Sequence, residues 1–320
     1  MDKSRRDFLK KSAIATGGLY MAATTPSLLF GRSNTFDFKI SLAEWSLNKE
    51  IFSGELDNLN FPVVAKEKYG INAVEYVNQF FPDKAKDKEY LKELKSRSDA
   101  SGVQNVLIMI DNEGFVAAVE DKVRNEAVEN HYKWIEAAEY LGCHAIRINL
   151  FGSQEPEEDV KAWTIAAVEG LGKLAEFGSE HKVSVIVENH GGLSSHGGYL
   201  ANVLKQIDSE WAGTLPDFGN FCIRKENDER WGEVCAEEYD VYKGVKDLMP
   251  YAKGVSAKTF NFDEDGNELN LDYMRLFKII KESGFNGGYV GIEYEGDSLS
   301  ADEGIRATKK LLEKVRAELS

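Results

Sequence analysis

From Phe38 onward, short β-branched runs alternate with longer segments whose apolar residues recur every three or four positions. Several of the longer segments end at a glycine, the common residue just after a helix. The units average about 36 residues without a linker or low-complexity break, which predicts a single (β/α)8 barrel over residues 34–320. The eight predicted strands cover residues 39–47, 73–80, 105–110, 145–151, 183–189, 213–218, 254–260 and 288–294.

A doubly wound sheet is the alternative fold. No glycine-rich phosphate loop follows the first predicted strand, and the GFNGGYVG segment leads into a strand instead of out of one. The barrel is therefore preferred. Its longest interruption, residues 223–239, lies between the sixth strand and the next helix and is rich in charge. We expect this segment to form a loop over the barrel mouth.

Residues 1–33 differ in kind from the rest of the chain. Arg5 and Arg6 precede a Phe-Leu-Lys triplet, and a weakly apolar run then extends to Phe30. This pattern is typical of a twin-arginine export signal, which an export receptor reads and which is not part of the fold. We therefore expect a periplasmic protein, or one anchored to the membrane by an uncleaved signal. No other run approaches the roughly 20 apolar residues of a membrane span.

Charge and cysteine content limit the partners. The net charge of −15 argues against a nucleic acid, because binding one requires a basic surface that displaces counterions. A small molecule is the expected partner, and association into a homo-oligomer stays open. The three cysteines are too few for a disulfide framework. Cys143 is expected in the core, and a Cys222–Cys235 bridge is left open.

Polar residues stand where the predicted strands end. The fifth run, VSVIVENHGGL, finishes with Glu188 and His190 beside an asparagine, although a buried strand gains nothing from such side chains unless a polar site lies beyond it. The sixth, seventh and eighth runs lead to Asp217, Lys258 and Glu293. Because the active site of a (β/α)8 barrel lies at the C-terminal strand ends, we expect these five residues to share one site.

Three carboxylates in one barrel mouth would repel one another unless protons or a cation intervened. A divalent metal bound by Glu188, Asp217 and Glu293 would relieve this repulsion and polarise a substrate oxygen. His190 could add a nitrogen ligand and shift the preference toward Mn, Co or Zn. The alternative is an internal ion-pair network in which Lys258 neutralises two of the acids.

Four motifs in the second half of the chain resemble the sugar phosphate isomerase/epimerase family of the xylose isomerase-like TIM barrels, and the resemblance covers residues 38–318. They read ENHGGLSSHGG, LPDFGN, VSAKTFNFDEDGNE and YVGIEYEG. The resemblance implies a Mn, Mg, Co or Zn ion held by Glu, Asp, His and Glu on strands five to eight. Glu188 and Glu293 match the two glutamates that also transfer a proton on opposite faces of a sugar, and Asp217 matches the aspartate.

The family histidine does not carry over. The seventh strand reads Ser256-Ala257-Lys258 where the family often has His-x-Lys, and Asn220 stands where many members have a further histidine. His190 or water could complete the metal site, or Lys258 could stabilise negative charge on the substrate in place of the missing ligand.

The combined hypothesis is a metal-dependent isomerase or epimerase of a free sugar, in which Glu188, Glu293 and Lys258 are catalytic. The loops after strands seven and eight, NFDEDGNE and EYEGDS, are acidic and would repel a phosphate. Two alternatives remain: a lyase or dehydratase that eliminates a β-substituent from a keto-sugar or keto-glycoside, and a non-catalytic sugar-binding barrel. The predicted substrate-binding residues are Trp45, Glu75, Arg147, Asn149, His196 and Asn220.

Overall fold

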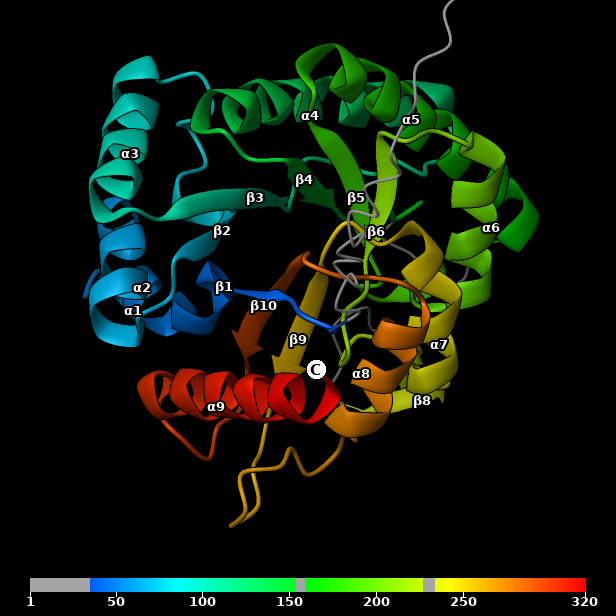
Figure 1. Ribbon diagram of the computed structural model, residues 1–320. Helices are drawn as coiled ribbons and strands as arrows, with labels where there is room; N and C mark the ends of the chain where they lie inside the picture. The colour runs from blue at the N-terminus through cyan, green and yellow to red at the C-terminus, as the bar shows by residue number, and fades with distance from the viewer. Residues whose placement is uncertain (1–34, 154–158, 227–233) are drawn as a thin grey trace, which may run out of the picture. The chain divides into compact units, whose positions relative to one another are not determined.

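Eight parallel strands form the centre of the fold in the computed structural model (Figure 1). The structure describes residues 35–153, 159–226 and 234–320, so the predicted export signal lies outside it. The strands are hydrogen-bonded in the order β6-β5-β4-β3-β2-β1-β10-β9. Their bounds are β1 (Lys39–Ala43), β2 (Ala73–Val77), β3 (Gln104–Ile110), β4 (Ala145–Ile148), β5 (Ser184–Glu188), β6 (Ala212–Leu215), β9 (Val255–Thr259) and β10 (Tyr289–Tyr294).

The two outer strands of this order approach each other as well. Parallel bridges join Thr214 to Ala252 and Asp217 to Ser256, which brings the end of β6 against β9. The sheet therefore closes into the predicted (β/α)8 barrel, and the doubly wound alternative is wrong. The helices lie around the outside (Figure 1). They are α1 (Asn48–Ser53), α2 (Phe61–Tyr69), α3 (Lys88–Ser101), α4 (Asp121–Leu141), α5 (Val160–His181), α6 (Gly197–Ile207), α7 (Val241–Leu248), α8 (Tyr273–Glu282) and α9 (Ala301–Leu319).

Several strands end earlier than the sequence predicts. β1 gives way to a 3-10 turn at Glu44–Leu47, and β2 to another at Asn78–Phe80. The apolar residues beyond these two strand ends, Trp45, Leu47, Phe80 and Phe81, remain buried or half-buried, so periodicity alone does not mark the end of hydrogen bonding. The early endings leave loops that carry polar side chains over the barrel mouth.

Apolar packing occurs in two layers. The larger layer lies between strands and helices and includes the fully buried Trp134 and Trp163. The smaller layer fills the barrel interior and is built mainly from small and aliphatic side chains, including Ala43, Ala73, Val77, Leu107, Met109, Ala145, Ile186 and Leu215. Such close packing blocks a through channel, which leaves the ends of the barrel for binding.

One carboxyl group interrupts the apolar interior. Glu75 is buried, and its Oε1 accepts a 2.6 Å hydrogen bond from Ser41 Oγ. A Cβ at position 291 would lie 2.6 Å from Glu75 Oε2, so only a glycine on β10 leaves room for this side chain. Burial raises the pKa of Glu75 to about 7, and the nearby Glu293 and Glu188 contribute in the same direction.

The charged segment after the sixth barrel strand contains a hairpin. Strands β7 (Cys222–Lys225) and β8 (Cys235–Glu238) pair antiparallel, and residues 227–233 between them lie outside the described residues. A disulfide joins Cys222 to Cys235, which settles the bridge that the sequence left open. Cys143 is buried, as expected.

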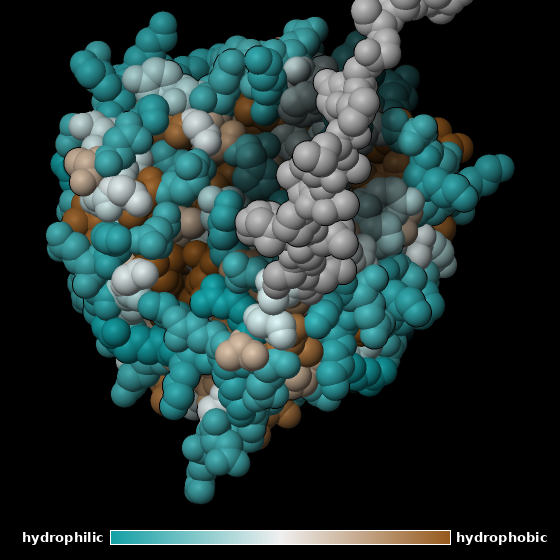
Figure 2. Space-filling view, viewed as in Figure 1, coloured by the Kyte–Doolittle hydropathy of each residue, from teal (hydrophilic) through white to brown (hydrophobic). Residues whose placement is uncertain are grey.

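The surface agrees with the acidic composition. Figure 2 shows a mostly hydrophilic face on which apolar residues appear in small separate areas. Within the described residues, no helix combines the length and apolar character needed to cross a membrane.

Two glycines offer a matched test of the packing that supports the hairpin. A Cβ at Gly244 in α7 would lie 2.1 Å from the ring of the fully buried Phe221, whereas a Cβ at Gly172 in α5 would meet nothing within 4 Å. We expect Gly244→Ala to lower the free energy of unfolding by about 1–3 kcal/mol through overpacking. Gly172→Ala should raise it by about 0.5–1 kcal/mol. Urea unfolding followed by circular dichroism measures both changes, and equal effects would contradict the described contact.

Candidate active site

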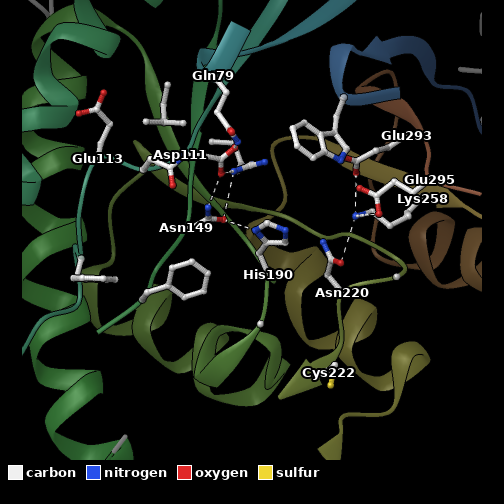
Figure 3. A pocket seen from close by; sticks show the side chains of 18 of the residues that line it. Gln79, Asp111, Glu113, Asn149, His190, Asn220, Cys222, Lys258, Glu293 and Glu295 are labelled. Atoms are coloured by element: carbon white, nitrogen blue, oxygen red, sulfur yellow. Dashed lines mark hydrogen bonds and ion pairs between the residues drawn. The ribbon is translucent and has the colours of Figure 1, made fainter. Parts of the chain in front are cut away.

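A cavity of about 690 Å³ lies at the C-terminal ends of the barrel strands. Most of its lining residues lie near or just beyond the C-terminal ends of barrel strands, His131 of α4 also lines it, and the β7–β8 hairpin contributes Cys222 and Lys225. Figure 3 shows the labelled side chains converging from these elements. The position agrees with the rule that (β/α)8 barrels place binding sites at this end.

Three buried carboxylates form the centre of the site. Glu188 is the last residue of β5, Asp217 lies two residues beyond β6, and Glu293 lies on β10. Each offers an oxygen within 4.8 Å of the others'. Asn189 fixes the strand ends, because its Nδ2 donates to the Asp217 carbonyl at 2.9 Å and its Oδ1 accepts from the Asp217 amide at 2.8 Å.

Each glutamate of this group has its own support. Arg147 Nε lies 2.7 Å from Glu188 Oε2, and Asn220 Nδ2 donates to Glu188 Oε1 at 3.0 Å. Ser256, at the position of the missing family histidine, donates its hydroxyl to Glu293 Oε2 at 2.8 Å. The position that the resemblance assigns to a metal ligand therefore orients one of the carboxylates.

Lys258 lies beside the same group. Its Nζ is 3.3 Å from Glu295, 3.6 Å from Glu293 and 3.9 Å from Asp217, and it donates to Asn220 Oδ1 at 3.3 Å. The side chain is almost fully buried. An ammonium in this position supplies part of the positive charge that the carboxylates require.

The surroundings give the acids different proton affinities. Burial raises the pKa of Glu188 to about 7 against the opposing effect of Arg147, and burial also raises the pKa of Asp217. Burial acts on Glu293 as well, but Lys258 and the Ser256 hydroxyl outweigh it and leave the pKa of Glu293 lowered. Burial disfavours charge on Lys258, yet the three acids around it raise its pKa. Glu293 is thus the ionised acid of a site in which Glu188 can hold a proton.

The three buried carboxylates together fit a divalent cation. Among the described residues, no hydrogen bond reaches the buried Asp217 Oδ2, whose nearest cation is Lys258 at 3.9 Å. Unpartnered carboxylate oxygen in a buried position is costly unless a proton or a metal satisfies it. Oxygen donors of this kind are the ligands that Mg and Mn prefer, so Glu188, Asp217 and Glu293 would hold such an ion.

His190 belongs to a neighbouring hydrogen-bond network. Its Nδ1 lies 2.8 Å from Asn149 Oδ1, while Asn149 Nδ2 donates to Asp111 Oδ1 at 2.6 Å. Arg147 Nη1 contacts the same Asp111 oxygen at 2.8 Å. Figure 3 shows this network on one side of the cavity and Lys258 with Glu293 on the other. The structure therefore does not bring His190 into the group of potential metal ligands formed by the described residues.

The predicted substrate-binding residues divide into two sets. Trp45, Arg147, Asn149 and Asn220 line the cavity. Glu75 lies in the barrel interior and is not among the lining residues. His196 is not either, because it caps α6 through a 3.2 Å bond from the Tyr199 amide to its Nδ1.

The cavity also contains charged residues that were not among the predicted site residues, and three of them bear on the chemistry of the site. Asp111 follows β3, Glu295 follows β10, and Lys225 extends from the hairpin. The strand-end rule was sufficient to find the first two. The sequence predicted that the charged segment containing Lys225 lies over the barrel mouth, but it did not single out this side chain, because the antiparallel pairing of the segment is not part of the barrel repeat.

The carboxylates can be tested as metal ligands by titration calorimetry. We expect Glu188→Gln, Asp217→Asn and Glu293→Gln each to weaken Mn²⁺ binding at least tenfold, because each replaces a charged ligand by a neutral one. Glu136→Gln alters an exposed glutamate and serves as the matched control. Unchanged Mn²⁺ affinity in all three variants would rule out this ligand set.

The electrostatic repulsion expected between the Lys258 ammonium and a bound divalent cation provides a second test. An ammonium next to a dication repels it, so Lys258→Met should tighten Mn²⁺ binding by about tenfold or more. The exposed Lys246 on α7 provides the control substitution, Lys246→Met. Weaker Mn²⁺ binding in the Lys258 variant would mean that the ammonium supports the cation instead of competing with it.

Comparison with known proteins agrees with the fold. The structure resembles the IOLI protein with a zinc atom (TM-score 0.67, 15% identity, covering 88% of this chain and 99% of that one). It also resembles a 3-keto-D-glucoside 4-epimerase from E. coli (TM-score 0.63, 14% identity, covering 87% of this chain and 100% of that one). A third similar structure is a D-psicose 3-epimerase with D-tagatose from Clostridium cellulolyticum H10 (TM-score 0.63, 13% identity, covering 87% of this chain and 99% of that one). No curated protein matches the sequence. Residues 64–315 match the family described as xylose isomerase-like TIM barrel, and the chain belongs to that family.

Proposed function

We propose that the protein is an exported, metal-dependent sugar epimerase or isomerase that moves a proton on a carbon next to a carbonyl of a non-phosphorylated sugar. The observation that carries this proposal is the buried group of Glu188, Asp217 and Glu293, whose oxygens lie within 4.8 Å of one another. Glu293 of this group lines a cavity that is large enough for a sugar.

Proton transfer next to a carbonyl needs a base, an acid and stabilisation of the oxygen that gains negative charge. Glu293, held ionised beside Lys258, is suited to accept a proton. Glu188, with a pKa raised to about 7, is suited to hold and return one near neutral pH. Return to the opposite face of the same carbon is epimerisation, whereas return to the neighbouring carbon is isomerisation. In the reverse direction the two residues exchange roles.

The positive groups supply electrostatic stabilisation. A divalent ion held by the three carboxylates would polarise the substrate carbonyl when bound. Lys258 donates from a buried position and can stabilise developing negative charge on a substrate oxygen. The charge of Arg147 is balanced by Asp111 and Glu188, so its role is to orient Glu188.

The disulfide and the loops support an exported enzyme of a free sugar. Disulfides persist mainly outside the reducing cytosol, so the Cys222–Cys235 bridge favours export by the predicted twin-arginine route. After β9, Asp263, Glu264 and Asp265 are exposed at a position where phosphate-binding barrels offer positive charge. Two structural neighbours are named for sugars that carry no phosphate: a 3-keto-D-glucoside 4-epimerase and a D-psicose 3-epimerase.

Incubation with keto-sugars in D2O tests the reaction class. With Mn²⁺ present, we expect deuterium to enter at the carbon next to the carbonyl without fragmentation, as followed by NMR and mass spectrometry. Glu188→Gln and Glu293→Gln should each reduce the exchange rate at least 100-fold, because general acid–base catalysis contributes about 10²–10⁴-fold. Glu136→Gln should leave the rate unchanged.

Other outcomes distinguish the remaining hypotheses. An unsaturated product would identify a lyase that expels a β-substituent. Binding of a sugar without any exchange would leave a non-catalytic sugar-binding barrel and overturn the proposal.

A further inference from the structure

Among the described residues, three lysine and arginine side chains line the cavity, and two of them are neutralised within it. Arg147 contacts Asp111 and Glu188, each at 2.8 Å or less. Lys258 lies within 4.0 Å of three carboxylates. Lys225 differs from both, because no carboxylate of the described chain forms an ion pair with it.

Lys225 is half-buried at the cavity wall. A lysine on an open surface is well solvated and needs no ion-pair partner. Partial burial next to a binding cavity removes some of that solvation, so an anionic group on a ligand becomes a favourable partner for the ammonium. Within the described chain, the acids of the cavity already have cationic partners or face the proposed metal, so an anionic group of the ligand is the counterion that we expect for Lys225.

A disulfide braces the hairpin that carries Lys225. Lys225 pairs with Cys235 across the hairpin, and the disulfide joins Cys235 to Cys222, which also lines the cavity. The flanking backbone is paired as well: the Glu226 amide donates to the Val234 carbonyl at 2.9 Å, and the Tyr239 amide donates to the Phe221 carbonyl at 2.9 Å. A lysine on such a braced hairpin loses less freedom when it binds a ligand than one on an open loop.

We propose that Lys225 binds a carboxylate of the substrate, so that the preferred substrates are sugar acids such as keto-uronates. This inference rests on the proposed sugar epimerase or isomerase function and names its substrate class. One ammonium matches the single charge of a carboxylate, whereas a phosphate dianion would keep an excess negative charge in a cavity that Glu293 and Glu295 also line. The cavity of about 690 Å³ can hold a six-carbon sugar acid together with water.

Calorimetric binding to matched ligands, with Mn²⁺ present, tests the proposal. The ligand pairs are D-fructose with D-fructuronate and D-tagatose with D-tagaturonate, and fructose 6-phosphate serves as the dianion. We expect at least one uronate to bind about tenfold or more tightly than its neutral partner, as charge-assisted hydrogen bonds allow. Lys225→Gln should abolish this preference without changing affinity for the neutral sugar. Lys225→Arg should retain most of it, and the exposed control Lys246→Gln should retain all of it.

The disulfide provides an independent readout. Reduction by dithiothreitol, or the Cys222→Ser/Cys235→Ser double variant, should weaken uronate binding selectively because the hairpin no longer holds Lys225 in place. Thermal unfolding of every variant confirms that the barrel is intact.

Three results would overturn the proposal: equal binding of uronates and neutral sugars by the unaltered protein, an equal loss for both in Lys225→Gln, or tighter binding of the phosphate than of the uronate. Failure of the proposed reaction looks different. If uronates bind through Lys225 but no sugar exchanges deuterium, the carboxylate site stands and the epimerase function does not.

Discussion

The active-site end of the barrel depends on the balance between buried carboxylates and the few cations that face them. Glu188, Asp217 and Glu293 cannot all be ionised in a buried space without positive charge nearby. Lys258 and Arg147 provide some of it from positions fixed by neighbouring strands. The negative charge that these two cations leave unbalanced makes the three carboxylates suitable ligands for a divalent ion. The same imbalance gives chemically similar acids different proton affinities.

The polar network around this group explains how short strands can hold it in place. Asn189 links the ends of β5 and β6 through two backbone hydrogen bonds, and Ser256 orients Glu293 from β9. Asn220 contacts both Glu188 and Lys258. Since each carboxylate is held by residues from another strand, the site is a property of the closed barrel and not of any single motif.

Much of this arrangement could be predicted from sequence because the barrel repeats one unit eight times. The strand-end rule was sufficient to group Glu188, Asp217 and Glu293, which the barrel does bring together. The rule could not predict the orientation of the His190 side chain, because its contact with Asn149 depends on how two loops pack. It also could not find Lys225, because a hairpin inserted between repeats has no periodic pattern that points its side chains toward the cavity.

The glycine in the middle of β10 connects the packing of the barrel interior to the charges at the barrel mouth. Gly291 leaves room for the carboxyl group of Glu75, and that carboxyl interacts electrostatically with Glu188 and Glu293. Adding one methyl group at position 291 would displace Glu75 and alter the proton affinity of both glutamates, although no residue that touches a ligand had changed. The charge balance of the carboxylates therefore depends on a packing position in the barrel interior, where the same few atoms determine both the fit of the core and the electrostatics of the site.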